Sequence, residues 1–204
     1  GRVMDVIAGM WRLASKMKDE RGALDGEPFD NADNARILRY LAKYTINAAR
    51  VFGVDHEVGS LETGKMADIV LWKPAFFGLK PQTVIKGGFT TWAAMGDAAA
   101  SVGAADPVRL RPTWGAVGSA PQSISTTFVH GRAIEEDLGG RLGLSKPLTA
   151  IGPTRGLTKA DMLHNTALPD IRVDTQTFDV YVDGQLAWCK PLEKVALGQL
   201  YLLR

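Results

Sequence analysis

Histidine is the first side chain to consider for catalysis or metal binding, and the sequence contains three, His56, His130 and His164. More than 30 residues separate each histidine from the next, and none lies in a His-x-His pair or beside a cluster of carboxylates. A metal site needs several donors that converge on one point. This spacing therefore argues against metal binding by any of the three.

Cys189 is the only cysteine, so it cannot form a disulfide within the chain. It follows Trp188 at the end of an expected hairpin strand. Free cysteine behaves as a small hydrophobic side chain when it packs in such a position. We therefore predict that Cys189 is buried or half-buried and has no catalytic role.

Asp68 lies between a glycine-spaced turn, marked by Gly59 and Gly64, and the apolar segment 69–72. The two glycines permit backbone angles that a side chain would forbid, while Lys65 is expected to stay hydrated. Asp68 can accept backbone N–H bonds where the strand begins. A lone carboxylate without a charge partner is weak evidence for a site, so we interpret Asp68 as structural.

The composition is that of an ordinary soluble globular chain. Of the 204 residues, 46% are apolar and 23% are charged, which is enough to bury one large core or two small ones. The formal net charge of +2 is interspersed along the chain, and it indicates neither a nucleic-acid partner nor a membrane partner. Apolar runs are far shorter than the roughly 18 residues of a membrane span. The single cysteine and the lack of a signal-peptide pattern predict a cytoplasmic protein.

The first predicted helix has apolar residues at spacings of three and four and ends near Gly22. Its apolar face comprises Val3, Ile7, Met10, Leu13 or Ala14, and Met17. This helix and the two that follow have no strand of their own to cover, so the three helices need a partner surface elsewhere.

Two shorter helices follow. One begins near Asp33 or Asn34, either of which can cap the first turn, and a second covers about residues 45–52 and stops at Gly53. The apolar stripe of the first of these is predicted to be Ile37, Leu38, Leu41 and Ala42.

Strands and turns come after Gly53. Residues 67–72, 84–86 and 89–92, with a bend at the glycine pair between the last two, predict a small β unit. Residues 93–118 are rich in glycine, alanine and proline and are expected to run as a surface connection.

The remaining sequence predicts a mixture of both elements. Residues 123–130 are expected to form a strand and residues 133–142 a helix weakened by two glycines. Residues 178–182 alternate with period two, turn at Asp183-Gly184 and return through 186–188 as a hairpin.

Several segments in order along the chain carry a recognisable pattern. At 59–69 the sequence reads Gly-x-x-x-x-Gly-Lys-x-Ala-Asp-hydrophobic, which resembles the return from the catalytic barrel to the small β domain of amidohydrolases. Further matching segments are RYLAKYTIN at 39–47, HEVGS at 56–60, PAFFG at 74–78, VIKGG at 84–88, MGD at 95–97, GAVGSA at 115–120 and KADMLHN at 159–165. Together they resemble the large (alpha) subunit of nickel-dependent ureases, from Gly1 to the C-terminus.

The resemblance implies a metal-dependent chemistry for the complete subunit. Ureases hydrolyse urea to ammonia and carbamate with two nickel ions, which a carbamylated lysine bridges and histidines and one aspartate hold. Such ions lower the pKa of bound water and polarise the urea carbonyl. In the family these ligands, the mobile flap histidine and the flap cysteine all precede the region that this chain matches. The resemblance therefore implies no catalytic, cofactor-binding or metal-binding residue here and no nickel bound by this chain alone.

The implied fold class is α/β, with the closing segments of a (β/α)₈ barrel, part of a small β domain and a C-terminal α+β segment. Residues 1–56 are expected to be the last barrel helices, 57–115 part of the β domain, and 116–204 a segment that packs back on the barrel. The chain would then correspond to about the C-terminal third of the subunit.

The resemblance also implies partners: the upstream part of the alpha subunit, the urease beta and gamma subunits, and further copies of the complete enzyme in a homo-oligomer. Two alternatives stay open. The chain could be a non-catalytic structural or assembly module that complements an upstream urease fragment, or a metal-independent binding domain that has kept the scaffold.

Overall fold

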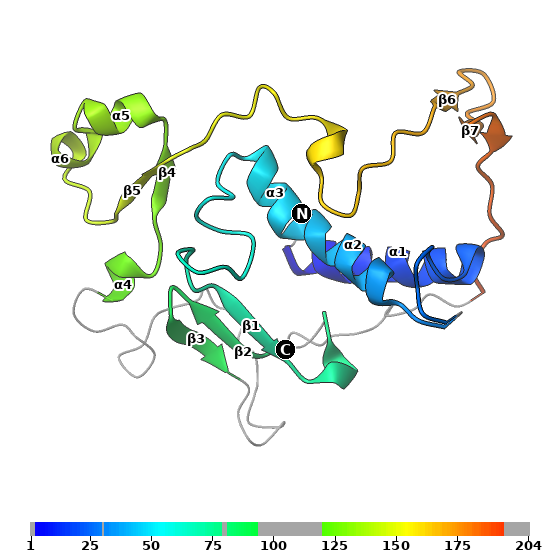
Figure 1. The fold of residues 1–204 in the computed structure, drawn as a ribbon, viewed down its shortest axis with the longest axis horizontal. Coiled ribbons are helices and arrows are strands. Elements are labelled where there is room, and N and C mark those ends of the chain that lie inside the picture. Colours follow the sequence, from blue (N-terminus) through cyan, green and yellow to red (C-terminus); the bar gives the residue numbers. More distant parts are fainter. Residues whose placement is uncertain (1–2, 30, 79–80, 94–119, 194–204) are drawn as a thin grey trace.

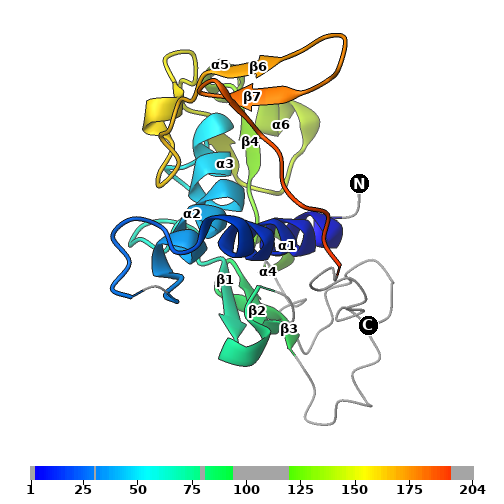
Figure 2. The same cartoon turned by 90° about the vertical axis from the view of Figure 1, so that its right-hand side faces the viewer.

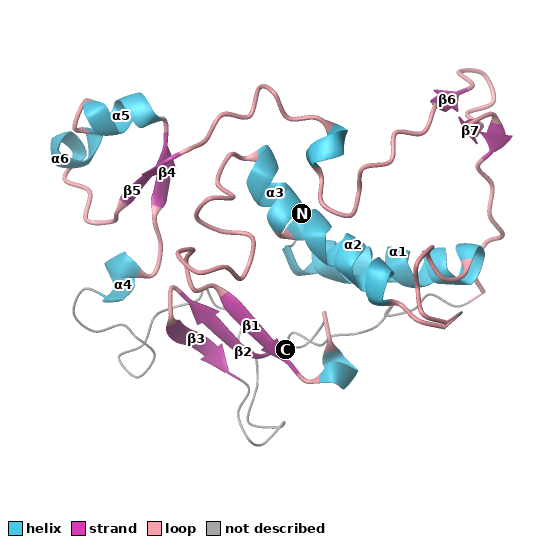
Figure 3. Cartoon of the chain, viewed as in Figure 1, coloured by secondary structure: helices cyan, strands magenta, loops and turns pink. Residues whose placement is uncertain are grey.

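The computed structural model describes residues 3–29, 31–78, 81–93 and 120–193 of the chain. Helices α2 (Asn34–Tyr44) and α3 (Ile46–Val51) follow one another through the middle of the molecule, and α1 (Val3–Arg21) packs beside α2 (Figure 1). Small β units surround this helical centre. Long loops join them (Figure 3).

Helix α1 ends where the sequence predicts. Gly22 follows it with a φ of 69°, and the Gly22 N–H donates to the Lys18 carbonyl at 2.8 Å. Of the two alternatives for the apolar face, Ala14 is buried whereas Leu13 is 46% exposed. The predicted face therefore passes through Ala14 and packs toward α2.

Helix α2 begins at Asn34, as predicted, but it is not capped by the side chain of Asp33. The Ala35 N–H instead donates to the Glu27 carboxylate at 2.5 Å, so a loop residue caps the helix. The predicted apolar stripe is also wrong at Leu38, which is 49% exposed. The buried residues of α2 are Arg36, Tyr40 and Ala42.

Four aromatic side chains join the helices to the first sheet. The Trp11 ring lies edge-on to the Phe77 ring with centroids 5.3 Å apart and to Tyr44 at 6.4 Å, and Trp72 lies 6.0 Å from Phe77. Edge-to-face pairs of this kind stabilise a core beyond the area that they bury. The cluster therefore joins α1 and α2 to the end of β1 and the turn that follows it.

The predicted small β unit is confirmed as an antiparallel sheet of order β1-β2-β3. Its strands are β1 (Ile69–Trp72), β2 (Pro81–Lys86) and β3 (Phe89–Ala93). Gly87 and Gly88 form the hairpin turn, both with positive φ. A Cβ at Gly87 would lie 2.7 Å from the Ile124 Cα, so the turn also packs closely on a later segment. Residues 94–119, which include most of the expected surface connection, lie outside the described residues.

The next unit differs from its prediction. A short helix α4 (Ala120–Ser123) precedes β4 (Thr127–Val129), so the strand expected at 123–130 is shorter. The expected helix at 133–142 is two helices, α5 (Gly131–Glu135) and α6 (Leu138–Leu142), separated at Asp137, whose φ is 52°. Strand β5 (Leu148–Ala150), which was not predicted, pairs with β4 in parallel.

The predicted C-terminal hairpin is confirmed and belongs to a three-stranded sheet. Strands β7 (Val180–Val182) and β8 (Gln185–Leu186) enclose the Asp183-Gly184 turn, and the unpredicted strand β6 (Ile171–Val173) pairs with β7. This sheet stands at the far end of the molecule from α5 and α6 (Figure 1).

Residues 152–165, which we name the tether segment, cross α2 and α3 between the last two β units (Figure 1). They include the 3-10 turn η3 (Lys159–Asp161). The Gly152 N–H donates to the Gly53 carbonyl at 2.6 Å. The Asn47 amide both donates to the Leu163 carbonyl at 3.0 Å and accepts from the Leu163 N–H at 2.8 Å.

Helices and strands are thus mixed, as an α/β class requires, but the described residues form no closed barrel. Two perpendicular views show separate sheets around the helices (Figure 1, Figure 2). Within the described part of the chain, no helix has the length and apolar character needed to cross a membrane.

Candidate functional site

The three histidines lie apart and make local contacts. His130 stands at the N-cap of α5, where its Nδ1 accepts from the Arg132 N–H at 3.2 Å. His56 lies exposed in a turn. His164 adopts a φ of 55°, and its carbonyl accepts from Arg39 Nε at 3.1 Å. The structure therefore does not bring these side chains together.

The donors of the described residues do not fit a dinuclear nickel centre. No three side chains among their histidines, cysteines, aspartates and glutamates are close enough to hold a metal ion together. Two metal ions require several converging donors. The absence of bound nickel from this chain alone stays a prediction.

The predicted burial of Cys189 is wrong, because its side chain is exposed, and its lack of a catalytic role stays a prediction. The hairpin strand β8 ends at Leu186, so Cys189 lies beyond the sheet. Trp188 beside it is 69% exposed. The apolar character of this stretch indicated burial that the sheet does not provide.

Asp68 has a clear structural role and, contrary to the sequence interpretation, a charge partner. Both carboxylate oxygens lie 2.8 Å from the Lys86 ammonium, and one also accepts from the Gly87 N–H at 2.9 Å. The carboxylate therefore joins the entry of β1 to the β2–β3 turn. Asp68 immediately precedes β1 and Lys86 ends β2, and their pairing matches the structural interpretation of the carboxylate.

Lys65 is not the hydrated side chain that the sequence suggested. Only 13% of its side chain is exposed, and its ammonium lies 2.6 Å from the Ser60 hydroxyl and 3.2 Å from the Glu62 carboxylate. The Lys65 side chain therefore binds within its own turn instead of extending into solvent. Its ammonium is hydrogen-bonded to side chains of the same turn.

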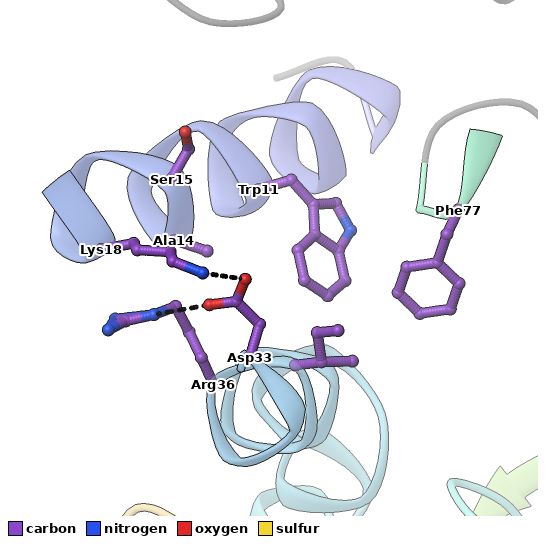
Figure 4. Close-up of a pocket in the computed structure, with 8 residues that line it drawn as sticks. Trp11, Ala14, Ser15, Lys18, Asp33, Arg36 and Phe77 are labelled. Atoms are coloured by element: carbon purple, nitrogen blue, oxygen red, sulfur yellow. Dashed lines mark hydrogen bonds and ion pairs between the residues drawn. The ribbon is translucent and has the colours of Figure 1, made fainter. Parts of the chain in front are cut away.

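A cavity of about 280 Å³ lies between α1 and α2, and charged side chains line one side of it (Figure 4). The Asp33 carboxylate lies 2.5 Å from the Lys18 ammonium and 3.7 Å from Arg36 Nε. The Arg36 guanidinium is almost fully buried and donates to the Gly22 carbonyl. Trp11 and Phe77 close the apolar side (Figure 4).

The lining of this cavity carries two cations, Lys18 and Arg36, and one carboxylate, Asp33, whereas Glu27 caps α2 from outside the lining. The Lys18–Asp33 ion pair and the Arg36–Gly22 hydrogen bond fasten α1 and its following loop to α2.

A second, larger hollow of about 640 Å³ lies between α2, α3 and β1 and is mainly apolar. We name it the apolar groove. Its rim carries Leu61 and Phe52, which are 75% and 72% exposed, and Val70, which is 42% exposed. Exposed apolar surface of this kind marks an interaction site more often than a catalytic one.

Sequence reasoning missed the side chains that organise this region. Asn47 is 5% exposed and Arg36 is 4% exposed. The available signal was their position on helices with apolar neighbours, since a buried polar side chain requires a partner. The identity of those partners, the backbone groups of Leu163 and Gly22, has no signature in the sequence.

Residues 1–91 match the amidohydrolase family. Over all 204 residues the chain is 50% identical to the urease subunit alpha of Natronomonas pharaonis, and it is also 50% identical to that of Haloquadratum walsbyi. In both cases the alignment covers 100% of this chain and 36% of the relative.

The chain therefore spans little more than a third of the length of these curated relatives. The sequence identity of the chain to each of the two relatives is the same, and both alignments extend past residue 91 through the C-terminal sheet. These matches agree with the urease-like segments and the glycine-spaced turn. Residues 1–91 thus match the amidohydrolase family, and the whole chain is similar to about a third of a urease alpha subunit.

Proposed function

We propose that this chain is the C-terminal part of a urease alpha subunit and serves as a scaffold for urea hydrolysis by the complete subunit. The 50% identity to two urease alpha subunits over the whole chain carries the proposal. The complete subunit would convert urea to ammonia and carbamate with two nickel ions. The residues described here do not fit such a centre, so its ligands would come from the remainder of the subunit.

The proposed division of the chain follows from the family. Residues 1–56 would supply the last helices of the barrel, 57–115 part of the small β domain, and 116–204 a segment that packs back on the barrel. The order of helices, antiparallel sheet and tether segment along the chain is compatible with this division.

Exposed apolar side chains support a scaffold role. Leu61 and Phe52 on the groove and Val6 on α1 are more than half exposed. Each large apolar side chain gains about 1.5–3 kcal/mol when it is fully buried. We propose that the remainder of the alpha subunit covers the apolar groove, and that the beta and gamma subunits complete the oligomer. The cytoplasmic location expected from the sequence stays a prediction.

Reconstitution tests this function. The chain would be coexpressed with the remaining part of a urease alpha subunit and with beta and gamma subunits in cells supplied with nickel. We expect copurification, nickel retained after dialysis and ammonia release from urea. Each of the two alpha-subunit parts expressed without the other should show neither activity nor a pair of tightly held nickel ions.

A matched pair of variants makes the test specific. Leu61→Asp places a charge on the apolar groove and should abolish copurification, whereas Thr63→Asp places the same charge two residues away, outside the groove lining, and should leave it intact. Copurification without activity would favour a non-catalytic assembly module. Failure to copurify, with a monodisperse folded chain, would favour a metal-independent binding domain and refute the scaffold role.

A further inference from the structure

Two aspartates of the sequence are followed directly by glycine, in the pairs Asp25-Gly26 and Asp183-Gly184. Glycine lacks the Cβ that otherwise shields a backbone nitrogen from the side chain of the preceding residue. The glycine nitrogen can therefore attack the carboxyl carbon of the aspartate and close a five-membered ring. The structure places the two pairs in different surroundings, so their reactivity should differ.

The first pair lies in the loop that joins α1 to α2. Asp25 and Gly26 are both exposed, and the Asp25 carboxylate makes no hydrogen bond or ion pair in the described part of the chain. Gly26 has a φ of 85°, and a Cβ built on it would meet no atom of the described residues within 4 Å. A backbone bond from the Glu27 N–H to the Leu24 carbonyl, at 3.2 Å, closes the turn. The carboxylate is thus free to approach the nitrogen when this bond opens.

The second pair is held in place by the C-terminal sheet. The Asp183 carboxylate accepts from the Asp170 N–H at 2.8 Å, and the Asp183 N–H donates to the Asp170 carbonyl at 2.8 Å. The turn also lies between β7 and β8, where Val182 pairs with Gln185. Ring closure at Asp183 would break the hydrogen bond of the carboxylate and disturb the hairpin.

We propose that Asp25-Gly26 is a modification site, at which the aspartyl peptide bond of the folded chain isomerises to an isoaspartyl bond. The Gly26 nitrogen attacks the carboxyl carbon of Asp25 and forms a C–N bond, and the carboxyl hydroxyl leaves as water with the proton of that nitrogen. Water then attacks the main-chain carbonyl carbon of the ring and breaks the bond of that carbon to nitrogen. The backbone afterwards runs through the Asp25 Cβ, with no net change of composition or oxidation state.

The position of this site gives the modification a structural effect. Isomerisation adds one carbon to the backbone just before Glu27, whose carboxylate accepts from the Ala35 N–H at 2.5 Å and caps α2. The longer backbone breaks the turn between Leu24 and Glu27 and displaces this carboxylate. Loss of the cap leaves a backbone donor of the first helical turn without its partner. The modification therefore loosens the start of α2, whatever the function of the complete protein.

The test compares the two pairs within one molecule. The 204-residue chain is incubated near neutral pH, and isoaspartate at residues 25 and 183 is measured over time by peptide mass spectrometry with electron-transfer fragmentation. We expect Asp25 to isomerise severalfold faster than Asp183 in the folded chain. In guanidinium chloride, where only the shared Asp-Gly sequence counts, the two rates should become similar. A ratio of the two rates that is no greater in the folded chain than in the unfolded chain would overturn the proposal.

Two variants test the link to α2. Asp25→Glu keeps the charge, but its additional methylene makes ring closure much slower, whereas Asp19→Glu makes the same change at an exposed position of α1. Circular dichroism verifies that both variants are folded. After incubation, the Ala35 amide should exchange with deuterium faster in the unaltered chain and in Asp19→Glu, but not in Asp25→Glu. Unchanged Ala35 exchange in chains with isoaspartate at residue 25, or an equal loss of protection in incubated Asp25→Glu, would refute the link.

Discussion

Replacing Asn47 tests how the tether segment is held against the helices. Its side chain is 5% exposed and makes two hydrogen bonds to the backbone of Leu163, at 3.0 and 2.8 Å. Asn47→Ala removes both bonds. Each typical intramolecular hydrogen bond contributes about 0.5–1.5 kcal/mol net, so the variant should weaken the attachment by about 1–3 kcal/mol.

Asn47→Asp should be more damaging than Asn47→Ala. The aspartate can still accept from the Leu163 N–H, but its second oxygen faces the Leu163 carbonyl, where the amide donated before. Two oxygens without a proton between them repel, and the carboxylate also loses hydration in this buried position. The expected order of stability is therefore Asn, Ala, Asp at neutral pH.

Hydrogen–deuterium exchange resolved by residue is the suitable assay, because the loss is local. An attachment weaker by about 1–3 kcal/mol should raise the exchange rate of the Leu163 amide by about 5- to 150-fold. Asn34→Ala is the matched control, since Asn34 is exposed at the start of α2. Unchanged protection of Leu163 in Asn47→Ala, or a less damaging Asp than Ala, would refute the reasoning.

Three further results are expected. Gly64→Val should lower the free energy of unfolding by about 1 kcal/mol or more, because the φ of Gly64 is +96°. Gly59→Val should lower it further, because a Cβ at residue 59 would lie 2.6 Å from another side chain. Chemical denaturation measures both changes, and wild-type stability of either variant would contradict the tight turn. Asp68→Asn should cost at most about 1 kcal/mol in the same assay, since both partners of its ion pair are about one-third exposed; a larger loss would show that the pair is energetically dominant. The pKa of Asp161 is lowered from 3.8 by hydrogen bonds from the backbone N–H and then the hydroxyl of Thr158. The Asp161 carboxylate therefore stabilises the fold above pH of about 4, and this stabilisation is lost as pH falls through the lower folded-state pKa. An NMR titration of the Thr158 amide with a midpoint at or above 3.8 would contradict this prediction.

The sequence pattern predicted those elements whose boundaries depend on residues only a few positions away. The stop of α1 at Gly22, the start of α2 at Asn34 and the hairpin at Gly87 follow from periodicity and glycine chemistry within a few residues. The same reasoning identified Asp68 as structural, because a turn that enters a strand leaves backbone donors to satisfy.

Errors arose where distant chain segments decide the environment. The exposure of Leu38 and Cys189 depends on which surfaces the rest of the molecule covers. Strand β5 is defined by its parallel pairing with β4, across two helices. The candidate site was also beyond prediction, since Arg36 and Asn47 bind backbone carbonyls that every residue type possesses. The family resemblance supplied the assignment that physical patterns could not.

The contact between Asn47 and Leu163 has a consequence for the order of folding. It joins residues 116 positions apart, and closing a flexible loop of that length costs about 4 kcal/mol of chain entropy. The β1–β3 meander and the α2–α3 pair close only short loops and can form early. The tether segment should dock late. Its first bond to the helices carries the entropy cost of closing the loop, and the following bonds form with little further loss of chain entropy. During synthesis, more than a hundred further residues would therefore have to be made before Leu163 could bind Asn47 and the tether segment could cross the helices.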